Sequence, residues 1–394
     1  MLENNKITEQ TLTGTTFTNW LKLLYENRFK ISLRYFPRAL FISVITLLTS
    51  PFVLYEKLRY AKRIRRTVFK QQPIFIVGHW RSGTTFLHSL MIQDKQFGYV
   101  TNVHAFMPNI FLCSGKLFQG LLRRFLPAKR RMDNIRLGLH EPQEDEYALA
   151  NLTNYSLYHG IAFPKNIRFY ARYCSMEGLP RKIVKKWTRV FLNFLKKVTY
   201  EAGGKQLILK NPAHTYRIGL LLKLFPEAKF IHIYRNPFDV FPSTLRMYEK
   251  MFPYFFLQKP FSMKEGKEII FDLYEEMFQR FFMEKQLIPK GNLIEIKYET
   301  FIQNPLQGLE QIYSGLNLQG FEKVKDHFQH YVAAQKNYQR NVHTLDKELE
   351  QEIATRWKFT LERLGYKKLK RLDNRIERKN IRKHLRGRKE PCEE

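Results

Sequence analysis

The chain is poor in cysteine. Its 394 residues include three, Cys113, Cys174 and Cys392, which stand far apart and form no CxxC pair. This spacing argues against a disulfide framework or a zinc site and is typical of a reducing compartment. The first twenty residues are too polar for a cleavable signal peptide. The sequence therefore predicts a cytoplasmic protein.

Acidic residues are also scarce relative to basic ones. The chain has 36 Asp and Glu against 67 Lys and Arg, a formal net charge of +31. Such an excess predicts attraction to polyanions, whether nucleic acid, anionic lipid or an anionic cofactor. Part of the charge lies in residues 366–394, which read as a basic C-terminal tail.

Long hydrophobic runs are missing apart from one uncharged stretch. It covers the 17 residues from Ala39 to Tyr55, with Lys and Arg on both sides. Seventeen residues is the short limit for a membrane-spanning helix, and Pro51 lies inside the stretch. The balanced positive flanks indicate no orientation. A membrane span, a helix at the membrane surface and an ordinary packed helix all remain open.

Short apolar runs alternate with helical patterns after residue 72. The runs are 73–77 (PIFIV), 206–210 (QLILK), 229–235 (KFIHIYR) and 292–299 (NLIEIKYE). Nearly continuous apolar strands are typical of a parallel sheet that is buried on both faces. The sequence predicts an α/β fold, a P-loop-like parallel sheet flanked by helices.

Three domains or segments follow from this pattern. Residues 1–72 are predicted to form a helical N-terminal extension, which could be associated with a membrane. Residues 73–365 are predicted to form the α/β domain, and residues 366–394 the basic tail. Within the α/β domain, the aromatic-rich stretches 105–200 and 245–290 predict helical insertions that cap the sheet.

The segment GHWRSGTT, residues 78–85, has the Gly78-to-Gly83 spacing of a phosphate-binding loop but lacks its lysine, since Thr84 follows Gly83. The strands that should supply a Mg²⁺ carboxylate end instead in Lys210 and Arg235. Because all three segments follow strands, they converge at one edge of the sheet. This edge suits an anionic nucleotide that reacts without a metal, and it disfavours ATP chemistry.

Three segments together resemble a known family. GHWRSGTT, ILKNPAHTYRIGLLLKLFPEAKFIHIYRNPFDVFPST and IEIKYETFIQNPLQGLEQIYSGL are similar to the sulfotransferases that use 3′-phosphoadenosine 5′-phosphosulfate (PAPS), especially the bacterial-type branch. The resemblance covers roughly residues 73–365. It implies in-line transfer of a sulfuryl group from PAPS to a hydroxyl or amine, without a metal. The acceptor would be a small molecule, a lipid or a carbohydrate, and no nucleic-acid partner is implied.

The same resemblance assigns the donor-binding residues. The 5′-phosphosulfate would be bound by Arg81, Ser82, Gly83, Thr84 and Thr85. His79 and Trp80 are further candidates for the cofactor site in the same loop, although Trp80 could equally pack on the acceptor or in the core. The 3′-phosphate would be bound by Arg235 and Ser243, and Arg340 or Lys336 would lie in a late basic segment over the nucleotide. The physical chemistry agrees, since glycine permits close backbone approach and a helix N-terminus favours an anion. Arg81 stands where cytosolic relatives have lysine, and it can donate to the bridging oxygen.

A general base is less clear. Cytosolic relatives place a histidine after the strand that ends here in Lys210; Lys210 matches the family's lysine, but the histidine position holds Pro212. The candidates are Glu144 first, then His214, then Glu141, because a carboxylate near a cleft can act as a base in other branches. Acids in a first helical turn can also serve only to complement the helix dipole.

Two other function classes remain open from the sequence. One is a nucleotide-dependent kinase or NTPase with a degenerate loop, and the other is a non-catalytic membrane- or polyanion-binding protein. The aromatic segment 251–261 favours an apolar or ring-bearing acceptor, although it also suits core packing.

Overall fold

The computed structural model describes residues 7–125, 138–335 and 345–366. The chain folds into two compact units, Met1–Leu345 and Asp346–Glu394. The second unit contains α16 (Lys347–Arg356) and α17 (Lys358–Arg363), with buried Trp357 between them. Everything described below belongs to the first unit.

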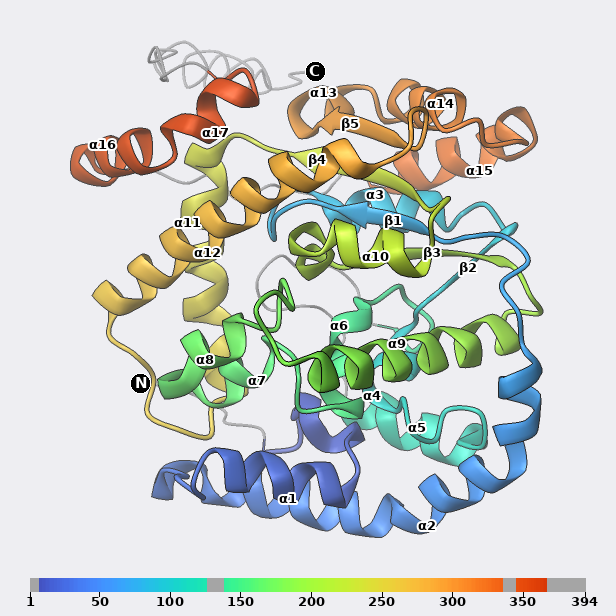
Figure 1. Cartoon of the computed structure of the whole chain (residues 1–394), viewed down its shortest axis with the longest axis vertical. Coiled ribbons are helices and arrows are strands. Elements are labelled where there is room, and N and C mark those ends of the chain that lie inside the picture. Colours follow the sequence, from blue (N-terminus) through green and yellow to red (C-terminus); the bar gives the residue numbers. More distant parts are fainter. Residues whose placement is uncertain (1–6, 126–137, 336–344, 367–394) are drawn as a thin grey trace, which may run out of the picture. The chain divides into compact units, whose positions relative to one another are not determined.

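A five-stranded parallel sheet forms the centre of the first unit, in the order β2-β3-β1-β4-β5 (Figure 1). The strands are β1 (Ile74–Val77), β2 (Phe97–Tyr99), β3 (Gln206–Lys210), β4 (Lys229–Tyr234) and β5 (Leu293–Lys297). All four residues of β1 are fully buried, as expected of a central strand with both faces covered. The predicted α/β class and parallel sheet are confirmed.

Alternate residues of β1 face two different layers. Ile74 and Ile76 belong to a core cluster with residues of α3 (Thr84–Met91), α14 (Pro305–Gly315) and α15 (Phe321–Ala334). Phe75 points to the other face, where its ring contacts Phe225 and His214, near α10 (Ile218–Leu224) and the 3-10 helix η4 (Pro212–Tyr216). The period of two along the strand therefore builds a three-layer sandwich.

Further helices surround this sandwich. They are α4 (Asn102–Phe106), α5 (Gly115–Phe125), α6 (Asp145–Leu152), α7 (His159–Ala162), α8 (Ile167–Ala171), α9 (Arg181–Glu201), α11 (Pro237–Lys250), α12 (Met263–Glu284) and α13 (Tyr298–Gln303). The predicted insertions at 105–200 and 245–290 are thus largely helical where they are described.

The N-terminal extension is also helical. It contains α1 (Phe17–Glu26) and the 31-residue α2 (Phe36–Arg66), which run side by side along one edge of the unit (Figure 1). Pro51 lies inside α2 without ending it. The helix in Leu33–Arg66 is long and apolar enough to cross a membrane by length and composition.

Candidate active site

The loop after β1 needs glycine at both ends of its motif. Gly78 has φ +137° and an added Cβ would lie 2.2 Å from the carbonyl oxygen of Ile233. Gly83, the N-cap of α3, has φ +92°, and its Cβ would lie 2.4 Å from the ring of Tyr298. The amide of Gly78 donates to Thr215 Oγ1 at 2.8 Å, which joins the loop to η4. Thr84 and Thr85 open α3.

Arg81 adopts a conformation that is unusual for its residue type. Its φ is +71°, in the left-handed region that costs a non-glycine residue about 1–2 kcal/mol. The guanidinium Nε donates to Ser243 Oγ at 3.0 Å. Arg81 thus combines a strained backbone with a side chain that reaches Ser243 of α11.

Arg235 follows β4 and reaches the same loop. Its Nη1 donates to the Arg81 carbonyl at 3.3 Å, its Cζ lies 4.8 Å from the centre of the Tyr298 ring, and Nη2 is 3.5 Å from Asp239 Oδ2. Its buried Nε has no hydrogen-bond partner among the described residues. A buried guanidinium N–H without an acceptor is suited to an anionic ligand.

The start of α11 is capped locally. Asn236 is the N-cap, and its side chain accepts from the amide of Phe238 at 3.1 Å, with Pro237 in the first helical position. Ser243, buried on the same helix, faces Arg81. The structure thus brings Arg81, Arg235 and Ser243 together from two strand ends. Arg340 and Lys336 lie outside the described residues.

Glu144 is the N-cap residue of α6 and is held from two sides. Lys210 Nζ, at the end of β3, lies 2.6 Å from Glu144 Oε1. The Tyr158 hydroxyl donates to the other carboxylate oxygen, and Trp80 Nε1 in turn donates to the Tyr158 oxygen at 3.1 Å. Burial, together with the charge of Glu144, raises the pKa of Tyr158 well above its usual value, so the phenol stays a neutral donor.

An apolar pocket opens beside these groups. Its polar wall is formed by the loop, the start of α3 and the N-cap of α6, through Arg81, Thr84, Thr85 and Glu144. The rest is mostly apolar and comes from the α7–α8 region, α11, the following segment and α12; it includes Leu157, Ile161, Ile167, Met247, Met251, Phe252 and Leu273. The pocket therefore pairs one ionisable carboxylate with an apolar interior, next to a loop built for an anion.

The other candidate residues lie away from this pocket. His214 is fully buried, with Nε2 2.8 Å from Asp145 Oδ2, and it does not line the pocket. Glu141 is half-buried in the preceding turn, where its backbone carbonyl accepts from the Asn102 amide. His79 packs its buried ring on Tyr274, and burial lowers its pKa to about 4.

Asp145 and Glu146 belong to a buried charge network behind the pocket. Glu146 is paired with Arg217 and accepts from Asn211 Nδ2 at 2.9 Å and from Ser156 Oγ at 2.7 Å. The charges of His214 and Arg217 help keep the pKa of Asp145 below its usual value despite the opposing effect of burial. Only Glu144 of this acidic stretch faces the pocket, because Asp145 and Glu146 point into the protein.

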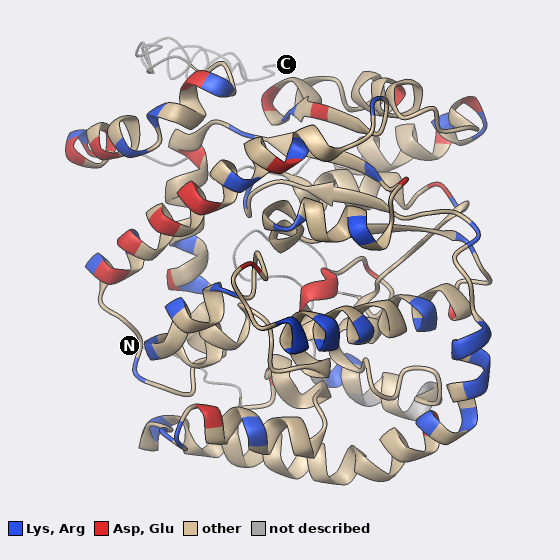
Figure 2. Cartoon of the chain, in the orientation of Figure 1, with Lys and Arg blue, Asp and Glu red and all other residues tan. Residues whose placement is uncertain are grey.

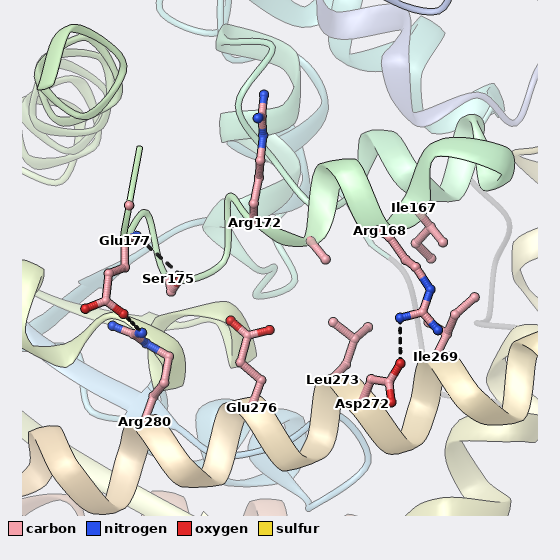
Figure 3. A pocket seen from close by; sticks show the side chains of 12 residues that line it. Ile167, Arg168, Arg172, Ser175, Glu177, Ile269, Asp272, Leu273, Glu276 and Arg280 are labelled. Carbon is pink, nitrogen blue, oxygen red and sulfur yellow. Dashed lines mark hydrogen bonds and ion pairs between the residues drawn. The ribbon is translucent and has the colours of Figure 1, made fainter. Parts of the chain in front are cut away.

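A second, polar groove lies between α12 and the segment around α8 (Figure 3). Arg168 Nη1 lies 2.6 Å from Asp272 Oδ2 in this groove, and Arg280 forms an ion pair with Glu177. None of the predicted site residues lines it. It shares Ile167 and Leu273 with the apolar pocket, so these two aliphatic side chains form a common wall.

Tyr158 and Thr215 are the site residues that the sequence did not reveal. Tyr158 is one of 21 tyrosines, and no motif marks it. Its contact with Glu144 depends on how the chain turns back after α6, which is a tertiary feature.

Comparison with known proteins identifies the family. The model of the sulfotransferase family matches residues 73–323. The chain is 32% identical over 354 residues to the ω-hydroxy-β-dihydromenaquinone-9 sulfotransferases Stf3 of Mycobacterium bovis and Mycobacterium tuberculosis, covering 90% of this chain and 90% of each relative.

Solved structures agree at the level of the fold. The sulfotransferase STF1 of M. tuberculosis superposes with a TM-score of 0.64 at 16% identity, over 88% of this chain and 93% of that one. The sulfotransferase STF9 of Mycobacterium avium gives 0.64 at 15% identity, over 84% and 86%. The kinase alternative is not favoured: this chain belongs to the sulfotransferase family.

Proposed function

We propose that this sulfotransferase uses PAPS as donor at the edge formed by the β1 loop and β4, and that it sulfates a hydroxyl on an apolar, lipid-like acceptor held in the apolar pocket. The observation that carries the assignment is the meeting of Arg81, Ser243 and Arg235. These residues come from two separate strand ends, and one of them has a buried N–H with no partner among the described residues.

The donor-side residues fit the charges of such a nucleotide. Arg235 and Ser243 would hold the 3′-phosphate, and the loop amides with Arg81 would hold the 5′-phosphosulfate. PAPS supplies an activated sulfuryl group on a phosphate leaving group. Arg81 donates to the bridging oxygen, where negative charge builds as the sulfur–oxygen bond breaks.

Glu144 is proposed as the general base. It accepts the proton that the acceptor hydroxyl loses while the acceptor oxygen bonds to sulfur. Lys210 and Tyr158 fix the two carboxylate oxygens, so the group is oriented toward the pocket before the acceptor arrives. Lys210 is 1% exposed and does not line the pocket, which supports a positioning role.

The acceptor class follows from the pocket wall. Met247, Met251, Phe252 and Leu273 offer apolar contacts and few polar ones. The similar Stf3 proteins are named for a hydroxylated dihydromenaquinone. We infer a hydroxylated lipid or another apolar alcohol, sulfated in the cytoplasm by an enzyme that works at the membrane.

The test is a comparison of two nucleotides by thermal unfolding. Adenosine 3′,5′-bisphosphate should stabilise the protein, by about 2.7 kcal/mol at a hundredfold excess over Kd, whereas ATP with Mg²⁺ should have little effect. Arg235→Ala should lose most of this stabilisation. Arg246→Ala, at an exposed position on the same helix, is the matched control and should keep it.

Two results would contradict the assignment. One is an equal response to both nucleotides. The other is a bisphosphate response that survives Arg235→Ala unchanged in a folded protein. Either would place the donor elsewhere, although the family membership would stand.

A further inference from the structure

We propose that α2 forms a membrane-docking face that lies flat in the surface of an anionic bilayer and does not span it. The docking itself is independent of the acceptor. Only the last step below, delivery of a lipid to the apolar pocket, rests on the proposed function.

The outer side of α2 is a row of exposed apolar side chains. Leu40, Leu47, Leu48 and Leu58 are 54–74% exposed, and Val44 and Tyr55 continue the row at spacings of three, four and seven residues. These spacings keep the side chains on one helical face. A contiguous row of exposed apolar side chains marks a surface that contacts a membrane or another protein.

The opposite side of α2 is fixed to the protein by buried polar groups. Arg38 donates to the carbonyls of Pro253 at 2.8 Å and Phe256 at 2.9 Å. Near the other end, Glu56 pairs with Lys197 and accepts from the Leu112 amide at 2.7 Å. In between, Ser43 accepts from Trp20 of α1 at 2.8 Å.

These contacts decide between a span and a surface helix. To cross a bilayer, α2 would have to leave its partners, and Arg38 and Glu56, which flank the uncharged stretch Ala39–Tyr55, would lose the hydrogen bonds and the ion pair that satisfy them. Lying in the interface keeps every one of these contacts and buries only the exposed row.

The charge around the row identifies the lipid. Residues 27–70 contain one acidic residue, Glu56, which is buried and paired. The exposed basic residues at the two ends are Arg28, Lys30 and Arg34 before the row and Lys57, Arg59, Lys62, Arg63, Arg65 and Arg66 after its middle. Figure 2 shows the middle of α2 free of charged colours and Lys and Arg gathered toward its C-terminal end. Each such cation near an anionic surface contributes about 1 kcal/mol.

The docking face continues into the wall of the apolar pocket. Tyr35, which precedes α2, belongs to the same apolar cluster as Leu157, Ile161 and Phe252 of the pocket. Arg38 donates to the carbonyl of Pro253, which directly follows the pocket residues Met251 and Phe252. A docked enzyme therefore has its pocket wall at the bilayer surface, where a hydroxylated lipid would enter without crossing water.

The test uses the full chain and vesicles of defined composition. Native protein should sediment with vesicles containing phosphatidylglycerol and bind pure phosphatidylcholine at least tenfold more weakly. A variant with Leu40→Glu, Leu47→Glu and Leu48→Glu should lose at least tenfold of the binding to anionic vesicles. Met283→Glu with Leu287→Glu, at exposed apolar positions in and after α12, is the matched control and should bind like the native protein.

Further measurements distinguish surface docking from a membrane span and from contact with a second copy of the chain. Bound protein should be released by alkaline carbonate; release by detergent alone would indicate a span and overturn the proposal. Light scattering should find the native protein and the triple variant in the same oligomeric state. A native dimer that the triple variant dissociates, without vesicle binding, would identify a second copy as the occupant.

The delivery step has its own readout. The triple variant should keep native turnover of a short, water-soluble alcohol acceptor and lose turnover of a long-chain acceptor supplied in vesicles. Equal loss on both acceptors would overturn delivery. Vesicle binding by a native enzyme that sulfates neither would contradict the proposed acceptor and leave docking intact.

Discussion

Glu144 combines two properties that its acidic neighbours do not share: it contacts a buried ammonium group and it faces an apolar pocket. Asp145 and Glu146 are equally acidic but have no access to that pocket. At the residue scale, access to the apolar pocket therefore distinguishes Glu144, the proposed base, from Asp145 and Glu146.

Glu144→Gln should lower kcat by at least about a hundredfold, because the amide cannot accept the acceptor proton. Affinity for adenosine 3′,5′-bisphosphate should change little, since the donor-side residues are untouched. Thermal stability should fall, because Lys210 would be buried without its carboxylate. Steady-state kinetics and nucleotide titration check these outcomes.

Glu141→Gln is the matched control, at a carboxylate that does not line the pocket, and it should leave kcat unchanged. A kcat for Glu144→Gln within threefold of the native value would rule out Glu144 as the base.

At the element scale, the turn from β1 into α3 joins three parts of the site. Gly83 begins α3, and the ring of Tyr298 packs directly against it. The same ring lies under the guanidinium of Arg235. A change at one glycine is therefore transmitted to both anion-binding positions.

Gly83→Ala should destabilise the protein by about 1–3 kcal/mol, because φ is +92° and the new methyl group would meet Tyr298. It should also weaken bisphosphate binding by displacing the ring under Arg235. Urea unfolding and nucleotide titration measure the two effects.

Gly120→Ala in α5 supplies the control with the opposite sign. An added Cβ there meets no atom, and alanine in an exposed helix gains about 0.5–1 kcal/mol. Equal stability of both variants would show that the turn at Gly83 can relax.

The sequence predicted those strands that carry a continuous apolar run. β1, β3, β4 and β5 carry continuous apolar runs, and their observed bounds agree with the runs within a few residues. β2 was missed because three residues, Phe97, Gly98 and Tyr99, give no readable period.

The site was predictable only where it follows strand ends. Parallel topology places such ends at one edge of the sheet, and the pairing of β1 with β4 then brings Arg81 next to Arg235. The burial of His214 and the contact of Tyr158 with Glu144 depend on how the 145–171 segment packs. Those contacts carry no sequence signature.

At the scale of the whole molecule, buried histidines couple folding to pH. Burial lowers the pKa of His79 and His159 to about 4 and that of His88 to about 3, from a usual value of 6.5. At these three positions the unfolded chain therefore binds more protons than the folded chain between pH 6.5 and 4.

Stability should consequently fall as the pH drops below about 6.5, by about 1 kcal/mol per buried histidine at pH 5.5. Urea unfolding at pH 7.5 and 5.5 measures the loss. A folded His88→Leu variant should show a smaller loss, whereas His330→Gln, at an exposed position, should show the native one. A urea midpoint independent of pH would contradict the neutral, buried state of these rings.

The buried charges behind the pocket limit how this active site can be borrowed. Glu144 is followed at once by Asp145 and Glu146, whose side-chain partners His214 and Arg217 come from a different part of the chain. An engineer who grafts the acidic segment onto another scaffold without those two partners would import uncompensated negative charge into its interior. The acidic segment should therefore be transferred or redesigned together with η4 and Arg217, which supply its partners.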